Sequence, residues 1–155
     1  MKFKVLVLAL TGLFVVSCGG DAKKDKAPSN EVKKEVKEEK YDPKTDKGIG
    51  PITSVTLGEL DEEMAATGKG VFKTKCSACH KVSKRFVGPA MAGVMDRRTP
   101  EWIMNMILNP EEMVAKNPAA KQLLAEYLSP MANQSLTETE ARQILEYFRT
   151  LKKAE

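Results

Sequence analysis

Cysteine and histidine gather at one place in this 155-residue chain, in the run Cys76-Ser77-Ala78-Cys79-His80. His80 is the only histidine, and Cys18 is the only cysteine outside the run. A structural zinc site normally needs four Cys or His ligands, and without Cys18 the chain offers three. A thioredoxin-like redox pair is expected within a βαβ unit, whereas no alternating strand pattern is present. Zinc and dithiol chemistry therefore explain the run poorly.

The spacing C-x-x-C-H is the sequence to which a c-type haem is attached. The two thiols add to the haem vinyl groups as thioethers, and the two intervening residues set the separation of the sulfur atoms. The histidine that follows then falls beneath the iron as the proximal ligand. We therefore predict one haem c, covalently bound through Cys76 and Cys79, with His80 as a ligand of the iron.

The N-terminus is typical of an exported protein. Lys2 and Lys4 precede an apolar run that extends to Val16, as in a secretory signal. The run is shorter than the roughly 18 residues expected of a membrane-spanning helix. Val15-Val16-Ser17-Cys18 also resembles the bacterial lipobox, whose cysteine is acylated and becomes the new N-terminus. We expect residues 1–17 to be a lipoprotein signal peptide, the alternative being an ordinary signal peptide with a chance cysteine.

Residues 18–52 are predicted to form a tether between an acylated Cys18 and the rest of the chain. From Asp21 to Lys47 there are nine Lys and eight Asp or Glu, with few apolar residues. Such a composition does not bury enough apolar surface to offset the entropy of ordering. The lipid would then hold the protein on a bacterial membrane, outside the cytoplasm and facing the periplasm. The formal net charge of +4 is too small to suggest nucleic acid as a partner.

Residues 53–155 have the apolar spacing of helices and the capping residues that begin them. We predict an all-α domain of four to five short helices, and so small a core suggests that a bound group helps to fill it. Asp61 begins the first predicted helix, and Asn109-Pro110 and Ser129-Pro130 end two others. The remaining helix starts are two caps followed by proline and one capping box, at Thr99-Pro100, Asn117-Pro118 and Thr137–Glu140.

From about Asp61 to Lys153 the chain resembles the class I (monohaem) cytochrome c family, in a membrane-anchored lipoprotein form. Gly68 and Phe72 stand eight and four places before Cys76, where the family's first helix crosses its last. Tyr147 and Phe148 stand where the last helix presents its aromatic residues. The resemblance implies the small cytochrome c fold, built around a covalently bound haem.

The resemblance also implies roles at the haem for two further residues. Val87-Gly88-Pro89-Ala90 looks like the family's turn, in which the Pro89 carbonyl accepts a hydrogen bond from the ring N–H of His80. Met131 lies 51 residues beyond His80, after Ser129-Pro130, at the family's position for the distal ligand. Met91, a lysine or other ligand, and an open sixth position are the alternatives.

Three polar side chains are candidates for contacts with the haem propionates. Trp102 is included among the cofactor-binding candidates, because its indole N–H is suited to donate to a haem propionate; packing alone is an equal alternative. Arg97 and Arg98 are suited either to neutralise propionates or to lie in solvent at a helix start.

We therefore expect an electron carrier rather than an enzyme, with His80 and Met131 as the iron ligands. A haem enzyme or gas sensor with an open sixth site is the alternative, and a detached subunit of a larger oxidase is a weaker one. Between Met64 and Met95 there are six cations and no acid. Such a face favours docking of a monomeric domain to an acidic surface on a respiratory complex, a terminal oxidase or a reductase. A solvated basic face and attraction to anionic lipid headgroups are the alternatives.

Overall fold

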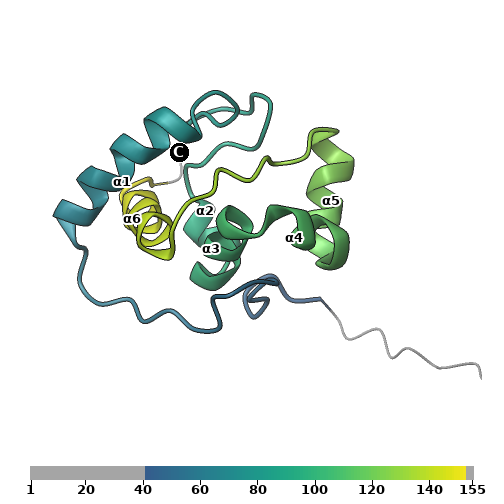
Figure 1. Ribbon diagram of the computed structural model, residues 1–155, viewed down its shortest axis with the longest axis horizontal. Coiled ribbons are helices and arrows are strands. Elements are labelled where there is room, and N and C mark those ends of the chain that lie inside the picture. The colour runs from purple at the N-terminus through teal and green to yellow at the C-terminus, as the bar shows by residue number, and fades with distance from the viewer. Residues whose placement is uncertain (1–40, 153–155) are drawn as a thin grey trace, which may run out of the picture. The chain divides into compact units, whose positions relative to one another are not determined.

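The computed structural model describes residues 41–152 of the chain. The expected signal peptide, Cys18 and the tether as far as residue 40 lie outside the described residues. Within 41–152 there are six helices and no strand, which confirms the all-α prediction (Figure 1). The helices are α1 (Glu62–Lys75), α2 (Val94–Arg97), α3 (Pro100–Leu108), α4 (Pro110–Lys116), α5 (Pro118–Tyr127) and α6 (Glu138–Arg149).

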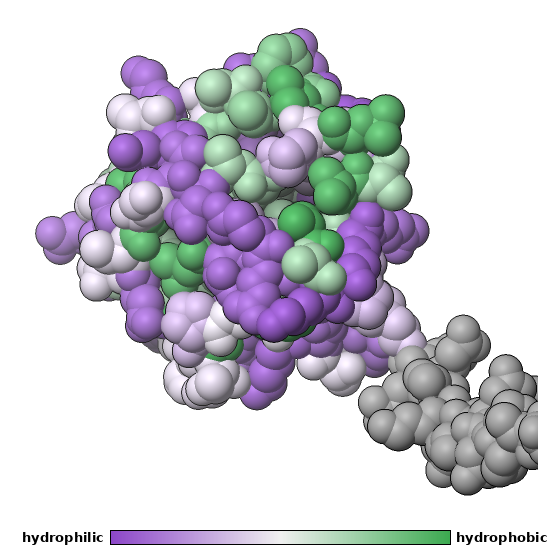
Figure 2. Space-filling model, turned by 45° about the vertical axis from the view of Figure 1, so that its right-hand side comes forward, coloured by the Kyte–Doolittle hydropathy of each residue, from purple (hydrophilic) through white to green (hydrophobic). Residues whose placement is uncertain are grey.

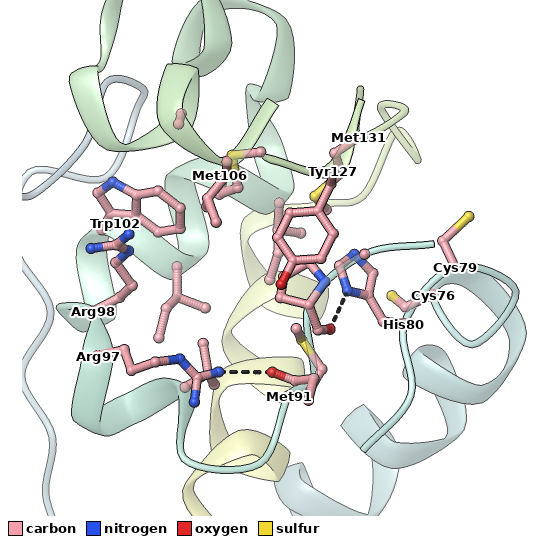
Figure 3. Close-up of a pocket in the computed structure, with 18 of the residues that line it drawn as sticks. Cys76, Cys79, His80, Met91, Arg97, Arg98, Trp102, Met106, Tyr127 and Met131 are labelled. Carbon is pink, nitrogen blue, oxygen red and sulfur yellow. Dashed lines mark hydrogen bonds between the residues drawn. The ribbon is translucent and has the colours of Figure 1, made fainter. Parts of the chain in front are cut away.

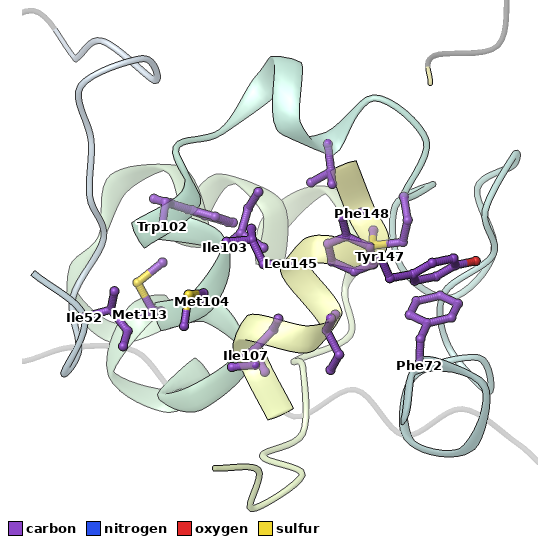
Figure 4. Packing of buried hydrophobic residues seen from close by; sticks show 14 of the residues in the cluster. Ile52, Phe72, Trp102, Ile103, Met104, Ile107, Met113, Leu145, Tyr147 and Phe148 are labelled. Carbon is purple, nitrogen blue, oxygen red and sulfur yellow. The ribbon is translucent and has the colours of Figure 1, made fainter. Parts of the chain in front are cut away.

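The first and last helices, α1 and α6, cross at a glycine. A Cβ atom built on Gly68 would lie 1.9 Å from the carbonyl oxygen of Gln143, so only glycine fits there. Phe72, one turn further along α1, packs its ring against the rings of Tyr147 and Phe148, with centroids 5.5 and 5.8 Å apart (Figure 4). Tilted and edge-on aromatic pairs of this kind add to the free energy gained by burying the rings. This crossing is the one expected from the sequence.

Three consecutive helices begin with a proline in their first turn, which is the favoured position for a residue without an N–H. Thr99 and Asn117 cap α3 and α5 by accepting hydrogen bonds from Trp102 N and Ala120 N. Helix α4 was not expected, because Asn109-Pro110 was interpreted only as the end of the preceding helix. Proline at N1 ends one helix and begins the next.

A segment that precedes the predicted domain is part of the same compact unit. Residues 41–52, which we call the strap, run beneath α3 before the chain reaches α1 (Figure 1). Ile52 is buried, and its N–H and C=O both bond to the side chain of Asn105, at 2.9 Å each. The compact unit therefore begins upstream of the boundary expected at residue 52, because these contacts offset the cost of ordering a polar segment.

Helix α6 also fixes the chain that enters α1. Glu146 is fully buried and accepts hydrogen bonds from Arg142 and Arg149, each at 2.6 Å. The same two arginines donate to the carbonyl oxygens of Thr56, Gly58 and Glu59. Burial acts to raise the pKa of Glu146, but the hydrogen bonds from the two arginines outweigh it, so this pKa is lowered.

Candidate functional site

A largely apolar cavity of about 670 Å³ lies between the end of α1, the loop after it, α3, α5 and α6. Its size is within the range of sites that hold a cofactor. The Cys-x-x-Cys-His residues line it, and so do Pro89, Met131 and Trp102. In Figure 3, Cys76, Cys79, His80 and Met131 lie toward one side of this cavity, and Arg97, Arg98 and Trp102 lie toward the other. The structure therefore brings all the sequence-predicted residues of the domain to one cavity.

The two thiols lie where α1 ends. Cys76 is the C-cap residue of α1, and a tight turn follows in which Cys79 N and His80 N both donate to the Cys76 carbonyl. Both cysteines are free thiols, Cys76 half-buried and Cys79 exposed. Burial, with a smaller contribution from Cys79, raises the pKa of Cys76 to about 11. Reactive redox cysteines have lowered pKa values, so this thiol is unlike the nucleophile of a thioredoxin-type pair.

The imidazole of His80 is oriented by the loop that follows it. His80 Nδ1 lies 3.1 Å from the Pro89 carbonyl oxygen, and the family resemblance implies the same hydrogen bond (Figure 3). A carbonyl only accepts, so Nδ1 carries the proton and Nε2 keeps its lone pair for a metal. A Cβ atom on Gly88 would lie 2.5 Å from the imidazole Cε1, so glycine is required beside the ring.

Three methionines of the described residues line the cavity: Met91, Met106 and Met131. Met91 is buried in the same loop as Pro89, and its N–H donates to the Lys81 carbonyl. Met106 projects from α3. Met131 is half-buried and comes from the loop after α5, beyond Leu128, whose positive φ of 53° turns the chain. Of these three methionines, Met131 alone lies in a loop that is separate from the loop after His80.

In the structure, the Trp102 indole has a partner within the protein, whereas the sequence suggested a haem propionate. Its indole N–H donates to Asn117 Oδ1 at 3.2 Å, so this hydrogen is already engaged within the protein. The ring of Trp102 lines the cavity and carries the guanidinium of Arg98 at 4.8 Å. The arrangement supports packing rather than donation to a propionate. Arg97 also lines the cavity and donates to the carbonyl oxygens of Ala90 and Ala92.

Several cavity residues were missed by sequence reasoning. Pro43 and Lys44 reach the cavity from the strap, which its composition suggested was a tether. Tyr127 reaches it from the end of α5, with the Arg85 guanidinium 4.1 Å above its ring. For the strap residues, the only sequence signal was a proline near the end of the charged segment, and it was weak. No signal in the sequence identified Tyr127.

The residues present fit a haem attached through thioethers. Two free thiols stand at one edge of an apolar cavity, an imidazole has Nε2 free, and a thioether sulfur lines the same space. No three His, Cys, Asp or Glu side chains within residues 41–152 converge as a metal site of their own. Two thiols, an imidazole and a thioether are the groups that attach a c-type haem and ligate its iron.

The fold and the cavity define a protein built to hold a c-type haem. The family model for cytochrome c matches residues 65–152, and the chain belongs to the cytochrome c family. Membership implies a covalently bound haem c.

Two curated relatives are both cytochrome c2 from Rhodopseudomonas palustris. One, from strain ATCC BAA-98 / CGA009, is 40% identical over 45 residues, which is 29% of this chain and 32% of that protein. The other is 53% identical over 34 residues, 22% of this chain and 29% of that protein. The matched region therefore spans about a third of the length of these relatives.

Solved structures show the likeness over more of the chain. Cytochrome c from Rhodothermus marinus is 46% identical, with a TM-score of 0.65, over 66% of this chain and 89% of that one. An engineered form of that protein bound to a carbene intermediate is also 46% identical, with a TM-score of 0.62. It covers 66% of this chain and 89% of its own. These likenesses confirm the predicted cytochrome c fold.

Proposed function

We propose that this protein carries single electrons through a haem c attached to Cys76 and Cys79, with His80 and Met131 as the iron ligands. The observation that carries the proposal is the joint lining of one cavity by the two thiols, an imidazole with Nε2 free, and Met131. Membership of the cytochrome c family supports a haem-based electron carrier.

The chain's own residues would hold the haem and tune it. The bound haem supplies a one-electron iron couple. Pro89 holds the Nδ1 proton of His80, which strengthens the imidazole as a donor. The thioether of Met131 is a soft ligand, and Met/His ligation raises the reduction potential. Apolar side chains that include Phe72 and Phe148 line the cavity and would shield a bound haem from water. With His80 and Met131 both bound to the iron, no coordination position would remain for a substrate, which supports electron transfer rather than catalysis.

The sixth ligand is tested by removing each cavity methionine in turn. Met131→Ala is expected to abolish the Met–iron charge-transfer absorption of the oxidised protein and to allow rapid CO binding by the reduced protein. Met91→Leu and Met106→Leu serve as matched controls, because both side chains line the same cavity and leucine conserves their volume. Rapid CO binding by the unmutated protein would instead support the haem enzyme or gas sensor.

We further propose that a basic and apolar face docks the protein to an acidic partner. Phe86 and Leu128 are large exposed apolar residues, with 54% and 84% of their surface accessible. Lys84 is exposed close to Phe86 in the chain, and Arg85, also exposed, is paired with Glu126 at 3.1 Å. Figure 2 shows apolar side chains gathered next to strongly hydrophilic ones on one face. Charges of this kind speed encounter with an acidic surface, and apolar contacts hold the complex.

Docking is tested by stopped-flow oxidation of the reduced protein by candidate respiratory oxidases and reductases. The second-order rate is expected to fall steeply with added salt, because exposed charges are screened. Lys84→Glu should slow the reaction, whereas Lys121→Glu on α5 is a matched exposed control outside the cation-rich region. A rate that does not depend on salt would contradict an electrostatic docking face.

We propose that the domain works as a monomer at an extracytoplasmic membrane surface, held by lipid on Cys18. No helix of the described residues is long and apolar enough to cross a bilayer. Several acyl chains on one cysteine exceed what stable membrane anchoring requires. Mass spectrometry of the mature N-terminus tests the lipid, and Cys18→Ser should release the protein from membranes.

A further inference from the structure

The strap lies upstream of the family match, which begins at residue 65, yet two of its residues line the cavity. We propose that the strap completes a carboxylate-binding end of this cavity, where Lys44, Arg97 and Arg98 take the propionates of the haem. The inference rests on the haem-binding role proposed above. It gives a segment outside the family domain a direct part in holding the cofactor.

The strap is anchored where α3 and α5 begin. The Asp46 carboxylate accepts two contacts from Asn117 Nδ2, at 3.0 and 2.8 Å, and the Asp46 carbonyl accepts from Thr99 Oγ1 at 2.6 Å. Gly48 has a positive φ of 75°, and a Cβ atom there would lie 2.9 Å from Met113 Sδ. The strap backbone therefore lies tight against the domain and holds Lys44 at the cavity.

The same anchor directs the Trp102 indole N–H away from the cavity. Because only the NH₂ group of an amide donates to a carboxylate, Asp46 fixes which way the Asn117 side chain faces. Asn117 Oδ1 then accepts from both Trp102 Nε1 and Ala120 N. The indole hydrogen is used within the protein, so a bound carboxylate needs donors from other residues.

Three cations supply those donors at this end. Lys44, Arg97 and Arg98 all line the cavity, and within residues 41–152 none of them forms an ion pair. Lys44 Nζ donates to the Asp96 carbonyl, and Arg98 donates to the Tyr41 hydroxyl at 3.3 Å. Because these partners are carbonyl and hydroxyl groups, they do not neutralise the positive charges of the three side chains.

The acids around this end do not cancel that charge. Asp96 is the one acid of the described residues that lines this end, since Glu126 lines the cavity from α5. Asp46 on the strap is bound to Asn117, and the carboxylate of Asp42 caps its own turn through Lys44 N. Three cations against one acid suit the two carboxylates of a haem. They would also raise the reduction potential, because positive charge opposes the oxidised iron.

The test compares two lysines of the strap in the haem-loaded protein. Lys44→Gln removes one of the three positive charges at this end of the cavity. Lys47→Gln removes the charge of a lysine that does not line the cavity and whose Nζ donates to the Thr53 carbonyl. Lys44→Gln is expected to lower the equilibrium constant for reduction by about fourfold. This factor is about 35 mV at 59 mV per tenfold change. The propionate bending modes in the resonance Raman spectrum should shift as well.

Lys44→Arg should keep both the potential and the Raman modes, because it keeps the charge. Equal effects of Lys44→Gln and Lys47→Gln, or propionate modes unchanged in Lys44→Gln, would overturn the proposal. Such a result leaves Met–iron absorption intact and is therefore distinct from failure of the proposed function. That failure would appear as unmutated protein without covalent haem or without Met–iron absorption.

Discussion

Gly68→Ala is the most informative single change in the fold, because the atom it adds points at backbone. At 1.9 Å from the Gln143 oxygen, the new Cβ also lies 2.3 Å from the Gln143 carbonyl carbon and 2.7 Å from Ile144 N. Ordinary contact begins at 3.4 Å, so α1 and α6 must separate by about 1.5 Å. A gap of 0.5–1 Å already forfeits about a quarter to a half of the dispersion energy at each contact.

We expect Gly68→Ala to lower the free energy of unfolding by about 3 kcal/mol, the upper end of the usual cost of overpacking. Gly70→Ala is the matched control on the same helix, since a Cβ there meets no atom within 4 Å. It should stabilise the protein by about 0.5–1 kcal/mol, because alanine loses less entropy in a helix.

Guanidinium unfolding of the haem-loaded protein, followed by far-UV circular dichroism, measures both variants against the unmutated chain. The two midpoints should move in opposite directions, with an unchanged slope. If Gly68→Ala were as stable as Gly70→Ala, the close backbone crossing of α1 and α6 would be refuted.

Three further predictions concern buried polar contacts. Arg149→Ala should lower the free energy of unfolding by about 2 kcal/mol, because it leaves the buried Glu146 with one arginine. The control, Lys116→Ala, removes an exposed ion pair and should leave the unfolding midpoint unchanged. The lowered pKa of Glu146 contributes stability that is present above its unfolded pKa of about 4.3 and is lost as pH falls through its folded pKa. Acid unfolding of Glu146→Gln should therefore depend less on pH below about 5, and an unaltered profile would contradict this assignment. Asn105→Ala should lower the free energy of denaturant unfolding by about 2–3 kcal/mol, since it removes three hydrogen bonds to the strap. A decrease below about 0.5 kcal/mol would show that the strap is not docked.

Local signals in the sequence predicted the helices that carry a side-chain cap. Thr137 and Glu140 form the expected capping box, and Asp61 accepts from Met64 N as a cap should. Helix α4 was missed because Asn109-Pro110 was interpreted only as the end of the preceding helix; in the structure, Asn109 makes no side-chain cap hydrogen bond. The acids at 111 and 112 were its remaining start signal, and the proline before them obscured it.

The strap was missed for a different reason. Its docking depends on single long-range contacts, such as Ile52 to Asn105 across 53 positions, and these leave no periodic pattern. The composition of residues 18–52 was averaged over the whole segment, so the strap was predicted to be a flexible tether like the charged part before it. The partner of Trp102 was equally hidden, because Asp46 orients Asn117 from 71 positions away.

The site was largely predictable because the chemistry of haem attachment fixes residue types at short spacing. Cys76, Cys79 and His80 follow from one motif, and the cavity brings them together. The family resemblance favoured Met131 as the distal ligand, from its place in the chain after Ser129-Pro130. Within the described residues, three methionines line the cavity and remain candidates for the distal ligand. The order of residues along the chain does not by itself establish this set.

Proton NMR of the reduced, haem-loaded protein tests the paired His80 and Met131 ligation most directly. A methionine methyl bound to ferrous iron lies over the porphyrin and is shifted far upfield by its ring current. One such three-proton signal is expected, present in Met91→Leu and Met106→Leu and absent in Met131→Leu. No upfield methyl signal in the unmutated protein, or one that survives in Met131→Leu, would contradict the account.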